Sequence, residues 1–135
     1  MLTLVDRLRS RHISVTPQRV AVLGILESRR DHPTAEQIYQ SVREQMPAIS
    51  FNTVYKTLEV FCQKGLLIKV NPLHEVAHYD IDTEHHIHLI CRKCHTIVDL
   101  PDEAAQIPSL TEGDQGGFQV ERHSLTFWGL CPQCQ

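Results

Sequence analysis

The sequence predicts an α+β protein with a helical N-terminal half and a C-terminal half of strands and metal-binding residues. Capping residues and helical spacing of apolar positions mark residues 1–70, whereas short apolar runs and clustered cysteines and histidines mark the rest. A length of 135 residues suits one ordinary domain or two very small ones. The composition, 41% hydrophobic and 21% charged, is that of a globular protein and argues against disorder.

Charge is distributed unevenly along the chain. Residues 1–70 carry ten Lys and Arg against six Asp and Glu, and residues 71–135 carry three against ten. Seven of the nine histidines and four of the five cysteines also lie in the second part. This asymmetry suggests a polyanion-binding domain followed by a metal-binding one, although chance segregation of surface charge would give the same pattern.

The sequence contains no sign of membrane insertion or export. No apolar run approaches the roughly 18 residues that indicate a membrane span. The N-terminal segment also lacks the long apolar region of a signal peptide. We therefore expect a cytoplasmic protein.

Four helices are predicted in the first part of the chain. Thr16 precedes a proline at the first helical position, which is typical of a helix N-terminus. Thr34 and Gln37 form a capping box. Within the second helix, Val20, Leu23 and Leu26 share one face. The predicted helices begin at Leu4, Thr16, Thr34 and Ser50, and the first, third and fourth end near Arg11, Met46 and Gly65.

The fourth predicted helix has an apolar face and exposed polar positions. The apolar face holds Val54, Leu58, Phe61 and Cys62. An apolar run over 66–70 follows, which predicts a strand that enters a turn at Asn71-Pro72. The remaining faces of the helix carry polar or amphipathic side chains, among them Asn52, Thr53, Tyr55 and Lys56.

Helices followed by a strand are the element order of a winged helix, a DNA-binding scaffold whose last helix enters the major groove. There Tyr55 can contact thymine methyl groups, and Lys56 can reach guanine acceptors or phosphates. The alternative is a plain helical core with a solvated polar face.

Two Cys-x-x-Cys pairs are the most specific feature of the second half. Four thiolates at this spacing can surround one Zn²⁺ tetrahedrally and leave no open position, so the predicted site is structural. Two disulfides or a redox dithiol are the alternatives, but a cytoplasmic chain disfavours the first and a redox site needs no second pair. Cys62 is expected to be a small core residue. The predicted ligands are Cys91, Cys94, Cys131 and Cys134.

A second group of candidate ligands consists of histidines and aspartates. His86 and His88 alternate with an isoleucine, so on a strand both imidazoles face the same side. Asp80 and Asp99 are expected on neighbouring strands, and His32 comes from the first half. Mixed nitrogen and oxygen ligands suit Fe²⁺, Mn²⁺ or Zn²⁺. The alternative is a solvated His-rich surface.

Catalytic motifs are absent from the sequence. It contains no Gly-rich phosphate loop, no His-Glu-x-x-His and no nucleophile elbow. Nothing in the sequence places a base beside Cys62. We therefore do not expect an enzyme.

The motifs together resemble the Fur family of metal-dependent bacterial repressors over nearly the whole chain. The resemblance implies an N-terminal winged-helix DNA-binding domain (1–75) and a C-terminal α/β dimerisation domain (76–135), acting as a homodimer on palindromic operators. It implies that Arg19 also contacts DNA, and it places the regulatory ion between the domains. The motifs are Thr16-Pro17-Gln18-Arg19, His32-Pro33-Thr34-Ala35-Glu36-Gln37-Ile38-Tyr39, Asn52-Thr53-Val54-Tyr55-Lys56-Thr57-Leu58, Asp80…His86-Ile87-His88-Leu89-Ile90-Cys91-x-x-Cys94 and Cys131-x-x-Cys134.

Within that family, the candidate ligands are similar to those of the peroxide-sensing branch. There bound Fe²⁺ reacts with hydrogen peroxide and a ligand histidine is oxidised, which by residue matching implicates His32 and His86. Iron sensors of the family typically have Glu where Asp80 and Asp99 stand, and zinc sensors usually add a cysteine. The alternatives are an iron- or zinc-responsive repressor, a peroxide-consuming non-haem iron enzyme, and a zinc-ribbon interaction module.

Two departures from the family pattern affect the expected sites. The extra metal site of many iron sensors needs an acid where Ile87 stands, so His85, Glu103 and His123 offer only a poor secondary site. The family often has Lys or Arg, a minor-groove contact, where this chain has Ser14. Arg11 or Arg19 is the candidate to supply that charge.

Overall fold

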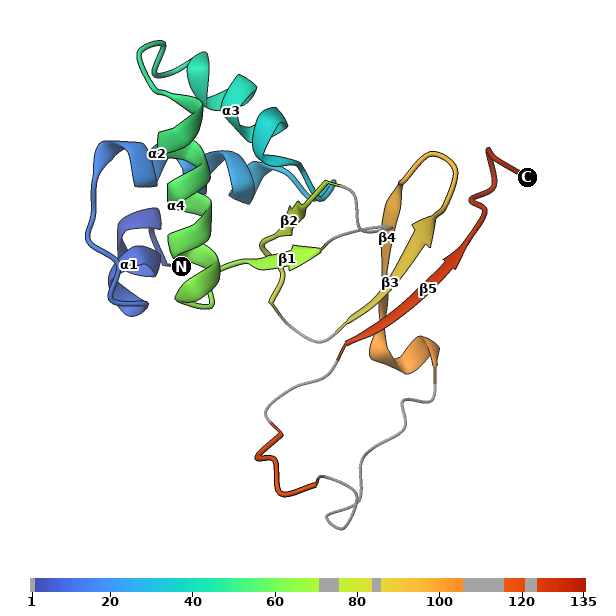
Figure 1. Cartoon of the computed structure of the whole chain (residues 1–135). Coiled ribbons are helices and arrows are strands. Elements are labelled where there is room, and N and C mark those ends of the chain that lie inside the picture. Colours follow the sequence, from blue (N-terminus) through green and yellow to red (C-terminus); the bar gives the residue numbers. More distant parts are fainter. Residues whose placement is uncertain (1, 71–75, 84–85, 106–115, 121–123) are drawn as a thin grey trace. The chain divides into compact units, whose positions relative to one another are not determined.

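The computed structural model describes residues 2–70, 76–83, 86–105, 116–120 and 124–135 (Figure 1). The chain divides into two compact units, Met1–Thr83 and Glu84–Gln135. The first unit contains α1 (Leu4–Ser10), α2 (Pro17–Ser28), α3 (Ala35–Arg43), α4 (Phe51–Gln63), β1 (Ile68–Val70) and β2 (His78–Asp80). The second contains β3 (His86–Cys91), β4 (Ile97–Pro101), the 3₁₀ turn η2 (Asp102–Ala104) and β5 (Leu125–Gly129).

The predicted helix starts are confirmed because side chains cap the free backbone amides there. Thr16 accepts from the amide of Arg19, and Ser50 accepts from that of Thr53. Thr34 and Gln37 form the expected capping box. The third helix ends at Arg43, short of the predicted Met46, since residues 44–48 form turns before Ile49.

The end of α4 explains where the following strand begins. Gly65 has φ 74°, a left-handed conformation that glycine adopts without steric cost. Leu66 and Leu67 then enter the core, and strand pairing begins only at Ile68, two residues after the predicted start. The predicted turn at Asn71-Pro72 lies outside the described residues.

The four helices enclose the core of the first unit. On α2 the buried residues are Val22, Leu23 and Leu26, while Val20 is only partly buried, so the buried face is rotated slightly from the predicted one. Cys62 is half-buried. The antiparallel pair β1 and β2 follows the helices, with Lys69 opposite Tyr79. This arrangement is a winged helix and confirms the predicted α+β fold class (Figure 1).

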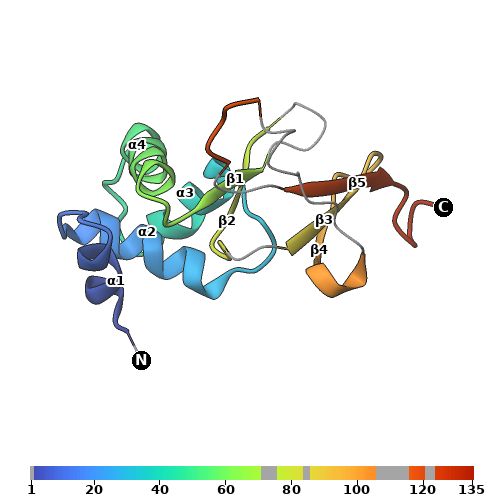
Figure 2. The same cartoon turned by 90° about the horizontal axis from the view of Figure 1, so that it is seen from below.

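The second unit is built around a three-stranded sheet in the order β4-β3-β5. Strand β3 pairs antiparallel with β4 and parallel with β5. Figure 2, in which the molecule is turned by 90°, also shows β5 beside β3. Ile87 and Ile90 of the central strand are buried. The parallel pairing ends with Cys91 opposite Gly129, which brings the two cysteine pairs to one end of the sheet.

The division between the units follows β-pairing. The resemblance implies a boundary between residues 75 and 76, whereas the compact units meet between 83 and 84. Residues 78–80 belong to the first unit because β2 pairs with β1. Among the described residues, no helix has the length and apolarity needed to cross a membrane.

Candidate metal centres and nucleic-acid interface

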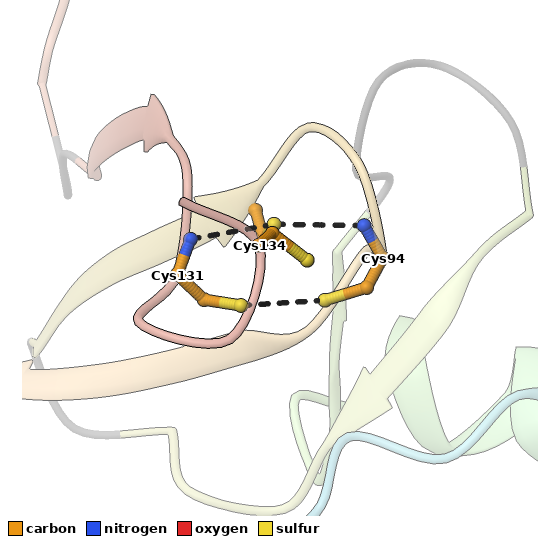
Figure 3. A group of neighbouring side chains, drawn as sticks. Cys94, Cys131 and Cys134 are labelled. Carbon is orange, nitrogen blue, oxygen red and sulfur yellow. Dashed lines mark hydrogen bonds between the residues drawn. The ribbon is translucent and has the colours of Figure 1, made fainter.

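The structure brings four cysteine sulfurs together at the end of the β4-β3-β5 sheet. Each of the four can offer its sulfur within 4.8 Å of the others. The sulfurs of Cys94 and Cys131 are 3.7 Å apart and point toward each other, with Cys134 beside them (Figure 3). Two backbone amides, from Cys94 and Cys131, donate to the sulfur of Cys91 at 3.5 and 3.4 Å.

The surroundings of these thiols favour negative charge at the site. Hydrogen bonds from the amides of Cys94 and Cys131 lower the pKa of Cys91 to about 5. A hydrogen bond with Thr96 lowers the pKa of Cys94. Hydrogen bonding to Cys131 raises the pKa of Cys134 to about 12, because thiols this close cannot all ionise without a cation.

This donor set fits a closed, structural Zn²⁺ site. Zinc favours four thiolates in tetrahedral geometry, and its charge allows the remaining thiols to ionise. All five cysteines are free thiols, so the described residues contain no disulfide. The disulfide alternative from the sequence is therefore not what the structure adopts.

The first unit holds one His–Asp pair. His32 lies just before α3, and Asp80 ends β2. Nε2 of His32 is 3.3 Å from Oδ2 of Asp80, and both side chains are less than a tenth exposed. The other carboxylate oxygen of Asp80 accepts from the amide of Asp82 at 2.9 Å, which fixes the carboxylate orientation.

The second unit holds another His–Asp pair. His88 on β3 lies directly opposite Asp99 on β4. Nε2 of His88 is 3.6 Å from Oδ1 of Asp99, with the histidine buried and the aspartate partly exposed. His86 begins the same strand, two residues before His88. The side chain of His86 itself lies outside the described part of the chain.

Other predicted ligands are placed differently from the expectation or are not described. Asp99 lies on a strand next to β3, but Asp80 lies in the separate β1-β2 sheet. The expectation of neighbouring strands is thus wrong for Asp80, because β2 finds its pairing partner in the winged helix. Glu103 is exposed on η2. Of the poor secondary site, His85 and His123 lie outside the described residues.

The predicted DNA-contacting residues lie on α2 and α4. Asn52, Thr53, Tyr55 and Lys56 are exposed on α4. Between the two helices lies a hollow of about 260 Å³ whose lining includes Arg19, Thr53 and Lys56. Hydroxyl, guanidinium and ammonium groups around a hollow suit contact with phosphate oxygens.

Sequence reasoning missed two residues beside these sites. Nδ1 of His78 lies 2.6 Å from the backbone oxygen of His32. Phe51 stacks on Tyr55 with ring centroids 6.4 Å apart. The signal for His78 was available, since on a strand it shares a face with Asp80. The stacking of Phe51 also had a signal, since Phe51 and Tyr55 are four residues apart on one helix. Only the edge contact of Phe51 with Tyr39 depends on how α3 approaches α4.

A winged helix followed by a sheet domain with a four-thiolate site and His–Asp pairs defines a metal-dependent DNA-binding regulator. The chain belongs to the ferric uptake regulator (Fur) family, whose model matches residues 10–128. Family members are transcriptional regulators that bind DNA and act as dimers, and this chain is a metal-responsive regulator of that kind. The predicted repressor class is therefore confirmed.

Comparisons with individual proteins agree with this family assignment. The chain is 36% identical over 133 residues to the peroxide-responsive repressor PerR of Staphylococcus aureus, covering 95% of this chain and 86% of that protein. It is 35% identical over 131 residues to the transcriptional regulator FurA of Mycobacterium bovis, covering 96% and 88%. The structure of the Campylobacter jejuni peroxide stress regulator matches with TM-score 0.71 and 30% identity, covering 98% of this chain and all of the other.

Proposed function

We propose that this regulator is a homodimeric repressor that senses hydrogen peroxide through Fe²⁺ at a site supplied by both units. The two His–Asp pairs carry the proposal: His32 with Asp80, and His88 with Asp99. His86 completes the ligand set, and Mn²⁺ occupies the same ligands without redox chemistry. Zn²⁺ at the four cysteines is structural.

The choice of metal follows from the donors. Imidazole and carboxylate ligands suit Fe²⁺ and Mn²⁺, whereas a thiolate would favour softer ions. Aspartates rather than glutamates stand at both acidic positions, as in the peroxide-sensing branch that the sequence resembles. The similarity to the PerR repressor supports the same choice.

Each pair lies in a different compact unit, and this division supplies the regulatory step. A ligand set divided between units is complete only when they come together, so the metal stabilises the joined state by its higher affinity for that state. The joined state sets the spacing of the two α4 helices in a dimer, which we propose matches the half-sites of a palindromic operator. Loss of the metal then releases DNA.

His32 is held in a fixed orientation within the proposed ligand set. Its side chain is 3% exposed, and Asp80 orients the ring from within the same unit. Bound Fe²⁺ would supply one electron to peroxide, which breaks the O–O bond to hydroxide and a hydroxyl radical. Addition of that radical to a ligand imidazole, followed by loss of one electron to the Fe³⁺ formed and of one proton, would leave one oxygen on the ring. An imidazole bearing that oxygen has altered basicity, so a damaged His32 or His86 binds metal more weakly and the repressor leaves its operator.

Peptide mass mapping tests this proposal. Protein loaded anaerobically with Fe²⁺ or Mn²⁺ is given dilute peroxide and digested. We expect one added oxygen on the peptide containing His32 or His86 in the iron sample alone. Many turnovers of peroxide without modification would indicate an enzyme instead, and unmodified histidines without turnover would indicate a metal-level sensor.

The similarity to FurA favours a second candidate, an iron- or zinc-responsive repressor without peroxide sensing. Operator binding, measured on the same purified protein, distinguishes the two functions. Titration of operator binding with Fe²⁺, Mn²⁺ and Zn²⁺ would then show repression that follows metal concentration and does not change with peroxide.

A further inference from the structure

His32 has an unusual backbone conformation for a residue with a side chain. Its φ is 53°, in the left-handed region that is uncommon for residues other than glycine, although histidine, asparagine and aspartate enter it more often than most. Such a conformation persists where the surrounding structure holds it, and it occurs in turns and at functional sites. The contacts that hold His32 in this conformation therefore help to determine where its side chain lies.

Strand β2 supplies these surroundings. The amide of Tyr79 donates to the carbonyl of Pro33 at 2.9 Å, and Thr34 forms a β-bridge with His78. The side chain of His78 adds a third contact, with its Nδ1 2.6 Å from the carbonyl oxygen of His32. Three consecutive residues, His32 to Thr34, are thus attached to one short strand.

The direction of the His78 hydrogen bond is fixed by its partner. A carbonyl oxygen can only accept, so Nδ1 of His78 carries the proton and donates it. A donor at this position holds the carbonyl of His32, and therefore the peptide group that follows the left-handed residue. His78 is half-buried, which shields this bond partly from competing water.

The alternation of a strand links this contact to the ligands. His78 and Asp80 project from the same face of β2, with Tyr79 buried in the core between them. One of them holds the backbone of His32, while the other lies 3.3 Å from Nε2 of its ring. The same strand therefore fixes both ends of this histidine.

We infer that His78 is a positioning residue for the regulatory metal. By donating to the carbonyl of His32, it holds that residue in the left-handed conformation from which its imidazole meets Asp80. This inference rests on the proposed function, because it takes His32 and Asp80 as ligands of the same ion.

The test compares two substitutions of equal shape. His78→Asn retains an N–H donor near the position of Nδ1, whereas His78→Leu has none. Affinity is measured by competition of Mn²⁺ with a fluorescent chelator, using full-length zinc-loaded protein. Loss of a group that orients a ligand typically costs 10- to 100-fold in metal affinity, so we expect a loss of roughly that size for His78→Leu and recovery of most of it in His78→Asn.

Two control variants separate this inference from the proposed function. His12 is an exposed histidine of the same unit that also has positive φ, and His12→Leu should bind Mn²⁺ like the wild type. His32→Ala should lose the site. Equal Mn²⁺ binding by His32→Ala and the wild type would overturn the proposed site itself. A loss in His32→Ala with wild-type affinity in His78→Leu would overturn only the role of His78.

A measurement on the wild type covers the case in which His78→Leu fails to fold. Long-range ¹H–¹⁵N spectra report which ring nitrogen of each histidine is protonated. They are recorded on protein that holds zinc at the four cysteines and no metal at the regulatory site. We expect the Nδ1–H form for His78, with its proton shifted downfield by the short hydrogen bond. The Nε2–H form would overturn the inference, since that ring cannot donate to the carbonyl of His32.

Discussion

Nη1 of Arg19 donates to both oxygens that Ser14 offers, the backbone carbonyl at 2.8 Å and the hydroxyl at 2.5 Å. The resemblance to the Fur family implies a basic residue at the position of this serine. Here the positive charge comes from α2 instead and is held beside that position. Arg19 also lines the hollow that contains Thr53 and Lys56.

We expect Arg19→Ala to weaken operator and non-specific DNA binding by similar factors, because phosphate contacts position a protein without reading sequence. The slope of log affinity against log salt should fall by about one for each arginine removed. Fluorescence anisotropy across a salt series measures both effects. Arg9→Ala, an exposed arginine of α1, serves as the control. An unchanged slope in Arg19→Ala would contradict a phosphate contact.

Phe51→Ala should selectively weaken operator binding. Phe51 stacks on Tyr55 and meets Tyr39 edge to face at 5.6 Å, so its ring restricts the side chain that is expected to read bases. Aromatic pairs contribute about 0.5–1.5 kcal/mol, which predicts a roughly 2- to 12-fold loss on operator DNA. Tyr55→Ala should lose more. Equal losses on operator and random DNA would show that the stack does not support base reading.

Removing one zinc ligand should lower the zinc content, whereas removing Cys62, the cysteine outside the site, should leave it unchanged. Cys134→Ser leaves three thiolates, so bound zinc should fall from about one per chain toward zero, with a lower melting temperature. Cys62→Ser should keep its zinc because Cys62 lies half-buried on α4 in the other unit. Metal analysis and calorimetry measure these outcomes. A zinc-free Cys62→Ser protein would contradict the assignment.

Tyr79 should make the first unit less stable in alkali. Burial raises the pKa of this phenol to about 12, against about 10 for an exposed tyrosine. The unfolded chain therefore loses this proton first as the pH rises, so stability present below about pH 10 is lost between about 10 and 12. Among the described residues, no hydrogen-bond partner lies near its hydroxyl. Tyr79→Phe should thus be at least as stable as the wild type at neutral pH.

The comparison of these two proteins is made by chemical denaturation from about pH 8 to about pH 11. The free energy of unfolding should decline more steeply in the wild type than in Tyr79→Phe. Parallel declines would mean that Tyr79 ionises as easily in the folded unit as in the unfolded chain.

Asp99→Glu should keep metal-dependent DNA binding and reduce peroxide sensitivity. The carboxylate of Asp99 lies 3.6 Å from His88, and a longer side chain changes both metal geometry and access to it. Operator release is followed against peroxide concentration, with metal affinity measured in parallel. A peroxide response equal to that of the wild type would show that Asp99 does not determine peroxide sensitivity.

Local signals predicted most of the fold. Thr34 and Ser50 marked helix starts correctly because capping depends on residues three positions apart. The cysteine spacings likewise predicted which sulfurs meet. The two-residue alternation placed His86 and His88 on one strand, and the apolar residues before Asp99 predicted the strand beside it.

Features that depend on distant parts of the chain were not predictable from local patterns. The left-handed conformation of His32 is imposed by β2, which lies 46 residues from it at His78. The pairing of β2 with β1 separates Asp80 from the sheet of β3. Nothing near Asp80 in the sequence specifies which strand it joins, because pairing depends on the whole winged helix.

The parallel pairing of β5 with β3 has a consequence for the order of folding. In the first unit, α1 packs on α2, α2 on α3, and α3 on α4, so its contacts form between elements close in sequence. The second unit instead includes a contact between Cys131 and Cys94, which lie 37 residues apart in the sequence. Contacts of this range form slowly, and N-terminal units fold first during synthesis. We therefore expect each new molecule to complete its winged helix before the sheet of the second unit forms.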